Sequence, residues 1–141
     1  PNVVFLLPYR VIEAAAETCT RLMAEPDSPV LGLHLEGHYL NMKMAGGQMP
    51  ENIKDPDPKE YIPIVEKWGC IKRWDAAPEL PGAMQFGKYI TGKGILLLWH
   101  IHRPNMKISV QPGSPVILML HISIMQCRAS ISVVSINMKV Q

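Results

Sequence analysis

Acidic residues are absent from the second part of this sequence. All twelve lie between Glu13 and Glu79, and none follows. Residues 97–141 contain four basic residues and no acidic one, where average usage predicts about five acidic residues. The same stretch is rich in Ile, Met, Ser and Val. The composition therefore changes partway along the chain.

Three further scarcities exclude whole classes of protein. The net charge is only +2, and no basic stripe with interleaved aromatics appears, which excludes a nucleic-acid partner. The apolar run at 95–99 falls far short of the roughly 20 residues that span a bilayer, so we expect no membrane partner. The three cysteines are widely spaced and form no CxxC pair or disulfide framework, which favours a reducing, cytoplasmic compartment.

The predicted elements alternate between helix and strand. Apolar residues at helical spacing and breaking Pro or Gly residues predict three helices and three strands. The helices are expected at 11–24, 59–68 and 82–91, and the strands at 30–35, 70–75 and 95–99, with a long loop at 37–58. This order predicts an α/β fold with right-handed crossovers and a parallel sheet. No clear pattern follows His100, although 117–134 fits one or two strands.

Candidate reactive groups follow the first of these strands. Glu36 stands beside Gly37 at the strand's carboxyl end, where the reactive groups of parallel α/β sheets gather. A carboxylate there can bind a divalent cation or act as an acid or base; the alternative is a loop carboxylate that caps a helix or pairs with a lysine. His34 shares the strand face of Glu36 and could be a ligand, but a hydrogen-bonded core histidine is the preferred interpretation. His38 is a histidine of the predicted loop, and the local sequence does not identify its interactions.

Other polar residues carry weaker signals. Asp75 and Glu79 flank the next strand end and could support the same site, but turn chemistry around Pro78 is preferred. His100 and His102 mimic the HxH metal motif of amidohydrolases, although that motif belongs on the first strand of such a barrel.

Several of these segments carry a recognisable family pattern. Leu31-Gly-Leu-His-Leu-Glu-Gly37, Leu40-Asn41 and the GGQMPENI segment at 46–53 resemble the pattern HLEGP-x-LN…KGTHNPE. The segments DAAPELPGA at 75–83 and FGKYITGKGIL at 86–96 continue the match in order and spacing. The pattern is that of the N-acetylglucosamine-6-phosphate deacetylase family.

The resemblance implies a fold, an activity and a site. The fold is a (β/α)8 barrel, and the chain, with 141 residues starting at Pro1, is expected to be an incomplete part of one, since such a barrel needs roughly 200 residues. The implied activity is hydrolysis of N-acetylglucosamine 6-phosphate to glucosamine 6-phosphate and acetate by a homodimeric enzyme with a divalent metal, zinc by expectation. Glu36 matches the metal-binding glutamate, and Gly47 and Gln48 match a Thr-His pair that contacts the sugar. His38 and Gln48 depart from the usual Pro and His.

The family's remaining essential residues are missing. They are a strand-end histidine in a GHT motif, a histidine in a THxYNAM motif and a general-base aspartate, and no aspartate follows Asp75. Back-translation of residues 121–139, read one nucleotide earlier, permits HFYNAMPGFHKRREYKYE, which contains the family's HFYNAM motif. We therefore expect residues 1–96 to form part of a barrel and residues 97–141 to be an out-of-frame tail. Residues 2–10 are a weaker case of the same kind.

This interpretation has physical consequences. An out-of-frame tail was not selected to pack, so we expect a sheet cut after three strands with an exposed edge. A single carboxylate cannot replace the missing groups, and the chain itself is expected to be inactive. The alternative is a non-catalytic domain that binds a sugar phosphate or a protein partner through the 37–58 loop.

Overall fold

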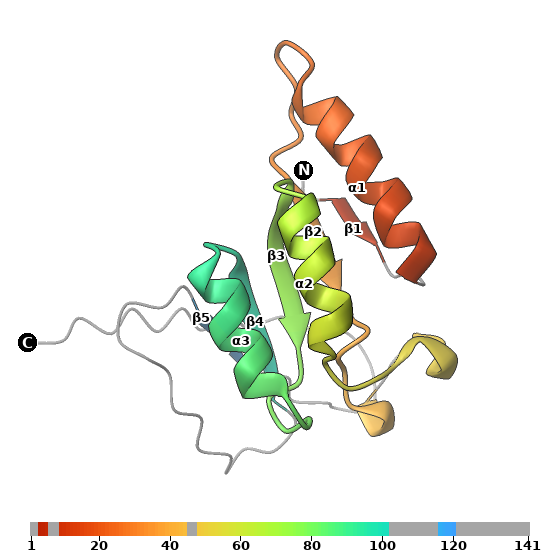
Figure 1. The fold of residues 1–141 in the computed structure, drawn as a ribbon, viewed down its shortest axis with the longest axis vertical. Helices are drawn as coiled ribbons and strands as arrows, with labels where there is room; N and C mark the ends of the chain where they lie inside the picture. The colour runs from red at the N-terminus through yellow and green to blue at the C-terminus, as the bar shows by residue number, and fades with distance from the viewer. Residues whose placement is uncertain (1–2, 6–8, 45–47, 102–115, 121–141) are drawn as a thin grey trace, which may run out of the picture.

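Three helices cover one face of a five-stranded parallel sheet (Figure 1). The computed structural model describes residues 3–5, 9–44, 48–101 and 116–120. The strands lie in the order β1-β2-β3-β4-β5, and every neighbouring pair is parallel. Their bounds are Val3–Phe5 (β1), Leu33–Glu36 (β2), Ile71–Ala76 (β3), Leu96–Ile101 (β4) and Val116–Leu120 (β5). The helices are Tyr9–Met23 (α1), Pro58–Lys67 (α2) and Ala83–Gly92 (α3).

All three predicted helices and all three predicted strands are confirmed, with ends shifted by a few residues. The expectation of a sheet cut after three strands is wrong. β1 precedes α1 in a segment where no strand was predicted, and β4 continues to Ile101. β5 then pairs with β4 along its length, within the region where one or two strands were expected. The boundary between residues 96 and 97 therefore falls inside a paired strand.

Local chemistry sets the limits of α2. Asp57 precedes the helix with extended backbone, and its side chain accepts a hydrogen bond of 2.9 Å from the amide of Lys59. Pro58 occupies the first helical position, where a missing N–H costs nothing. Tyr61, Ile64 and Val65 form the buried face. The long 37–58 loop ends here, and it contains two short 3-10 helices, Met42–Met44 and Pro50–Asn52.

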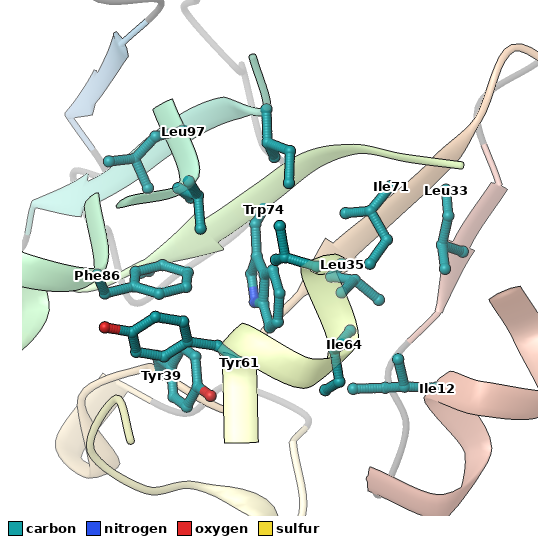
Figure 2. Close-up of a cluster of buried hydrophobic side chains, with 14 of the residues drawn as sticks. Ile12, Leu33, Leu35, Tyr39, Tyr61, Ile64, Ile71, Trp74, Phe86 and Leu97 are labelled. Carbon is teal, nitrogen blue, oxygen red and sulfur yellow. The ribbon is translucent and has the colours of Figure 1, made fainter. Parts of the chain in front are cut away.

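Aromatic rings fill the core between the helices and the sheet (Figure 2). Tyr39 stacks on Trp74 with ring centroids 5.6 Å apart. Phe86 meets both rings edge-to-face, at 5.0 Å from Tyr39 and 5.2 Å from Trp74, and Tyr61 meets Phe86 at 5.0 Å. These are the offset and T-shaped arrangements that aromatic quadrupoles favour. The cluster fixes the start of the 37–58 loop, through Tyr39, against β3.

A bulge in β3 decides which residues face away from the helices. Leu33 pairs with Ile71, but His34 pairs with Arg73, so one extra residue, Lys72, lies on β3 between them. Beyond the bulge, alternation puts Trp74 in the core and Arg73 and Asp75 on the opposite face. We call the latter the polar face; it carries the side chains of His34, Glu36, Arg73, Asp75 and His100.

Among the described residues, none of the helices combines the length and the apolar character needed to cross a bilayer.

Candidate functional site

The carboxyl ends of β2, β3 and β4 bring the polar face together. Glu36 is the last residue of β2, and it lies opposite Asp75 in the β2–β3 register. Because all the strands are parallel, their carboxyl ends share one edge of the sheet, where binding sites of α/β proteins form. Two carboxylates placed directly across a strand pair repel each other, so one of them needs a compensating charge.

Asp75 receives that compensation from three side chains. His34 Nε2 lies 2.8 Å from Asp75 Oδ1, and His100 Nε2 lies 3.0 Å from Oδ2. The Arg73 guanidinium donates to both oxygens, from Nε to Oδ1 at 2.8 Å and from Nη2 to Oδ2 at 3.1 Å. The carboxylate is 1% exposed, and the four side chains form what we call the Asp75 cluster. It ties the ends of three neighbouring strands together.

The surroundings of Asp75 determine its charge. Burial favours the neutral acid, but the hydrogen bonds from His100, His34 and Arg73 and the nearby His34 charge outweigh burial. They hold the pKa of Asp75 well below its ordinary range, so this carboxylate is ionised at neutral pH. Glu36, across the strand pair, is partly exposed and lies at the rim of the cluster.

Gln48 lies against the turn that follows Glu36. Its Nε2 donates a hydrogen bond of 3.1 Å to the backbone carbonyl of Glu36. Gly37 has a φ of +108°, and a Cβ at that position would lie 2.3 Å from Gln48 Nε2. The backbone angle favours glycine, and a Cβ here would displace the Gln48 amide, which is the far end of a flexible side chain. The structure brings together two residues named from the sequence, whereas Gly47 lies outside the described residues.

Backbone and side-chain hydrogen bonds hold the start of the 37–58 loop over the strand ends. His38, buried with a φ of +61°, accepts a 2.8 Å bond at its carbonyl from the Lys54 amide. Proline cannot adopt a positive φ, so this backbone requires the departure from the family's usual Pro. Asn41 Nδ2 donates to Glu79 Oε1 at 2.7 Å, which joins the loop to the segment after β3.

The structure confirms some of the predictions made for the polar residues and contradicts others. The interpretation of His34 as a hydrogen-bonded core histidine is confirmed. Turn chemistry for Asp75 is wrong, because Asp75 is buried and binds three side chains; Glu79 likewise binds Asn41, 38 residues away. His100 joins the Asp75 cluster, and His102 lies outside the described residues. Arg73 was missed, although its place two residues before Asp75 on a strand signalled a shared face.

The donor set of the described residues does not fit a metal site. Within 9–44 and 48–101, no three His, Cys, Asp or Glu side chains are grouped so as to hold a metal ion. The Nε2 atoms of both His34 and His100 are directed at Asp75 rather than at Glu36. Glu36 is the predicted ligand at this edge, and one carboxylate is too few for a catalytic zinc site, which uses three protein ligands.

The known proteins that this chain is similar to, in sequence and in structure, all carry the same enzyme name. No family model matches the chain. The N-acetylglucosamine-6-phosphate deacetylase of Lysinibacillus sphaericus is 30% identical over 76 residues, which cover 50% of this chain and 19% of that enzyme. The chain resembles a fragment of an N-acetylglucosamine-6-phosphate deacetylase. The family resemblance seen in the sequence is thereby confirmed.

Solved structures of deacetylases share the fold. The enzyme of Pasteurella multocida superposes with a TM-score of 0.63 at 23% identity, over 71% of this chain and 26% of that one. The Mycobacterium smegmatis enzyme gives 0.60 at 22% identity, over 70% and 25%. A substituted form of the latter, in complex with N-acetyl-D-glucosamine-6-phosphate, gives 0.63 at 20% identity, over 70% of this chain and 26% of that one. The expected fold, part of a (β/α)8 barrel with parallel strands, is confirmed, and the chain spans about a quarter of these structures.

Proposed function

We propose that this chain is part of a deacetylase that hydrolyses N-acetylglucosamine 6-phosphate to glucosamine 6-phosphate and acetate. The observation that supports the proposal is the position of Glu36 in its HLEG motif. It ends β2 at the carboxyl edge of a parallel sheet, with Gln48 hydrogen-bonded to its carbonyl. In the family pattern the corresponding positions hold a metal-binding glutamate and a loop histidine that contacts the sugar.

Within this proposal each matched residue has one role. In the complete parent enzyme, Glu36 would be one of several protein ligands of the metal, expected to be zinc, and Gly47 and Gln48 would contact the sugar. That metal would lower the pKa of a bound water molecule and polarise the acetamide carbonyl. Gln48 donates one N–H to the Glu36 carbonyl. Its amide has a second N–H and an oxygen that can bind a hydroxyl of the sugar. The proposal includes a homodimeric parent enzyme in the cytoplasm; the wide spacing of the three cysteines in the sequence supports a reducing compartment.

We propose that the 141-residue chain itself does not catalyse the reaction. The general base that the family needs is an aspartate, and the sequence has none after Asp75. Asp75 cannot replace it, because its two oxygens already accept hydrogen bonds from Arg73 and face His34 and His100. Acetate release by the purified chain above the level of Glu36→Ala would contradict this proposal.

The proposal includes a change of reading frame that produced the tail expected at residues 97–141. Leu97 and Trp99 are buried in the core, and both approach Gly87 of α3 where a Cβ would lie within 3 Å of them. Such complementarity is typical of selected packing. It favours a frame change after β4 rather than at residue 97. The DNA sequence tests the change of reading frame. The proposal is contradicted if the codons for residues 121–139, read one nucleotide earlier, do not encode HFYNAM and the frame is open and unshifted.

The second candidate is a sugar-phosphate-binding domain without catalysis. It is favoured by the incomplete donor set around Glu36 and by the fixed position of Gln48. Calorimetric titration with glucosamine 6-phosphate, with and without Zn²⁺, separates the two candidates. A deacetylase fragment should bind the sugar phosphate more tightly with Zn²⁺ in the wild type and not in Glu36→Ala. The exposed Glu51→Ala is the matched control. Equal binding without metal favours the second candidate.

A further inference from the structure

Two cysteines lie side by side between α1 and the amino end of β3. Cys19 and Cys70 are both 4% exposed and belong to the same hydrophobic core. Cys70 Sγ lies 3.4 Å from the backbone oxygen of Ala16. Ala16 and Cys19 are three residues apart on a helix, so they share the face that meets Cys70. The Cys70 thiol therefore lies against the part of α1 that carries Cys19.

The backbone of Cys70 is fixed in this position. Its carbonyl accepts a 2.7 Å hydrogen bond from the Leu33 amide, which joins the start of β3 to β2. Burial, and then the neighbouring Cys70 thiol, raise the pKa of Cys19 to about 11. Cys19 and Cys70 are free cysteines. Burial keeps both sulfur atoms from small reagents while α1 stays packed.

We propose that Cys19 and Cys70 form a reversible disulfide that locks α1 onto the sheet. The oxidant is a low-molecular-weight disulfide. One protein thiolate attacks it, releases one small thiol and leaves a mixed disulfide; the second protein thiolate attacks the protein sulfur of that mixed disulfide and releases the other small thiol. Two protein thiols are oxidised to one S–S bond, the small disulfide is reduced to two thiols, and the protons of the protein thiols end on them.

Forming the disulfide removes only one weak hydrogen bond from the folded chain. Cys70 gives up its S–H donor to Ala16, but the same backbone oxygen also accepts a 2.8 Å bond from Thr20 Oγ1. Cys70 precedes β3, so the link lies at the amino end of the sheet, away from Glu36 and Asp75 at the carboxyl edge. In barrel folds that end contributes to stability rather than to chemistry. The disulfide thus stabilises the packing of α1 on the sheet and leaves the candidate site unaltered.

Mass spectrometry tests the proposal on the full chain with Cys127→Ser, so that only these two thiols remain. After incubation with oxidised glutathione at about pH 8, a value close to the ordinary thiol pKa, tryptic digestion should join the peptides 11–21 and 68–72 with the loss of two hydrogen atoms. The melting temperature should rise by about 10 °C and return on reduction. Cys19→Ala and Cys70→Ala serve as controls that give neither change.

Three results would overturn the proposal. One is a glutathione adduct on either cysteine that never resolves into the link. Another is a link that forms only in urea, and the third is a linked chain that melts at or below the temperature of the reduced one. The direct peptide link keeps the test valid even where an alanine variant fails to fold.

Discussion

His34 and His100 approach opposite oxygens of the same buried carboxylate, at 2.8 Å and 3.0 Å from Asp75. β3 lies between β2 and β4, so the two histidines reach Asp75 from neighbouring strands on either side. With the Arg73 fork, these contacts neutralise a charge that would otherwise repel Glu36 across the β2–β3 pair. The cluster thus holds the strand ends and leaves Glu36 as the acidic group at the rim.

Asp75→Asn should destabilise the chain by about 3 kcal/mol, because removing one partner of a buried charged network leaves the others uncompensated. The amide would also turn an N–H toward Arg73 or a histidine. Urea unfolding followed by circular dichroism measures the loss. Glu13→Gln is the matched control: its ion pair with Lys67 is half exposed, and its loss should cost less than about 1 kcal/mol. Equal losses for the two variants would show that the Asp75 cluster contributes little.

The contribution of Asp75 should also depend on pH. Its folded-state pKa is lowered, chiefly by hydrogen bonds that overcome burial, so as the pH falls the unfolded chain takes up a proton first, near its ordinary value of about 3.9. The stabilisation is therefore complete above that value and is lost as the pH falls below it. The difference in unfolding free energy between wild type and Asp75→Asn should shrink as the pH falls from about 5 toward 3. A difference that grows below about pH 5 would contradict the lowered pKa.

Gly37→Ala should weaken both the fold and the position of Gln48. The residue needs a φ of +108°, and a Cβ would lie within 2.7 Å of three atoms of the Gln48 amide. We expect a loss of about 1–3 kcal/mol in stability, from backbone strain and displacement of Gln48. Gly69→Ala is the control, since a Cβ there meets nothing within 4 Å. Thermal unfolding of the two variants measures the difference, and similar melting temperatures would contradict this account of the turn.

The sequence predicted the alternation of helix and strand because breakers and apolar periodicity are local signals. Asp57-Pro58 marks the start of α2, and Gly92 and Gly94 mark the end of α3. The family motif also singled out Glu36 and Gln48, and the Gln48 amide donates a hydrogen bond to the Glu36 carbonyl. The Asp75 cluster escaped prediction because it joins residues 25 and 41 positions apart. Which oxygen meets which imidazole depends on the strand register and on the bulge at Lys72, and neither leaves a mark in the local sequence.

β1 and β5 were missed or left open for a related reason. Three to five apolar residues, such as VVF at β1, occur in many contexts, and only pairing with a neighbouring strand makes them a strand. The compositional shift after residue 96 argued against a packed segment there, yet β4 continues to Ile101 and pairs in parallel with β5. Amino-acid composition indicates whether a segment is read in its original frame. Strand pairing depends on backbone hydrogen bonds and apolar side chains, which a segment of either origin can supply.

Gly87→Ala tests whether β4 packs as selected sequence. A Cβ on this α3 residue would lie 2.8 Å from Trp99 Cζ2 and 2.9 Å from Leu97 Cδ2, contacts that rigid side chains cannot relieve cheaply. Despite the better helix propensity of alanine, overpacking should destabilise the chain by about 1–3 kcal/mol. Gly92→Ala, at the end of the same helix with nothing within 4 Å of the new Cβ, should be neutral or slightly stabilising. Chemical unfolding compares the two, and Trp99→Leu should partly rescue Gly87→Ala by vacating the space. A neutral Gly87→Ala would mean that residues 97–99 do not pack against α3 in solution, and the change of reading frame would then move back to the start of β4.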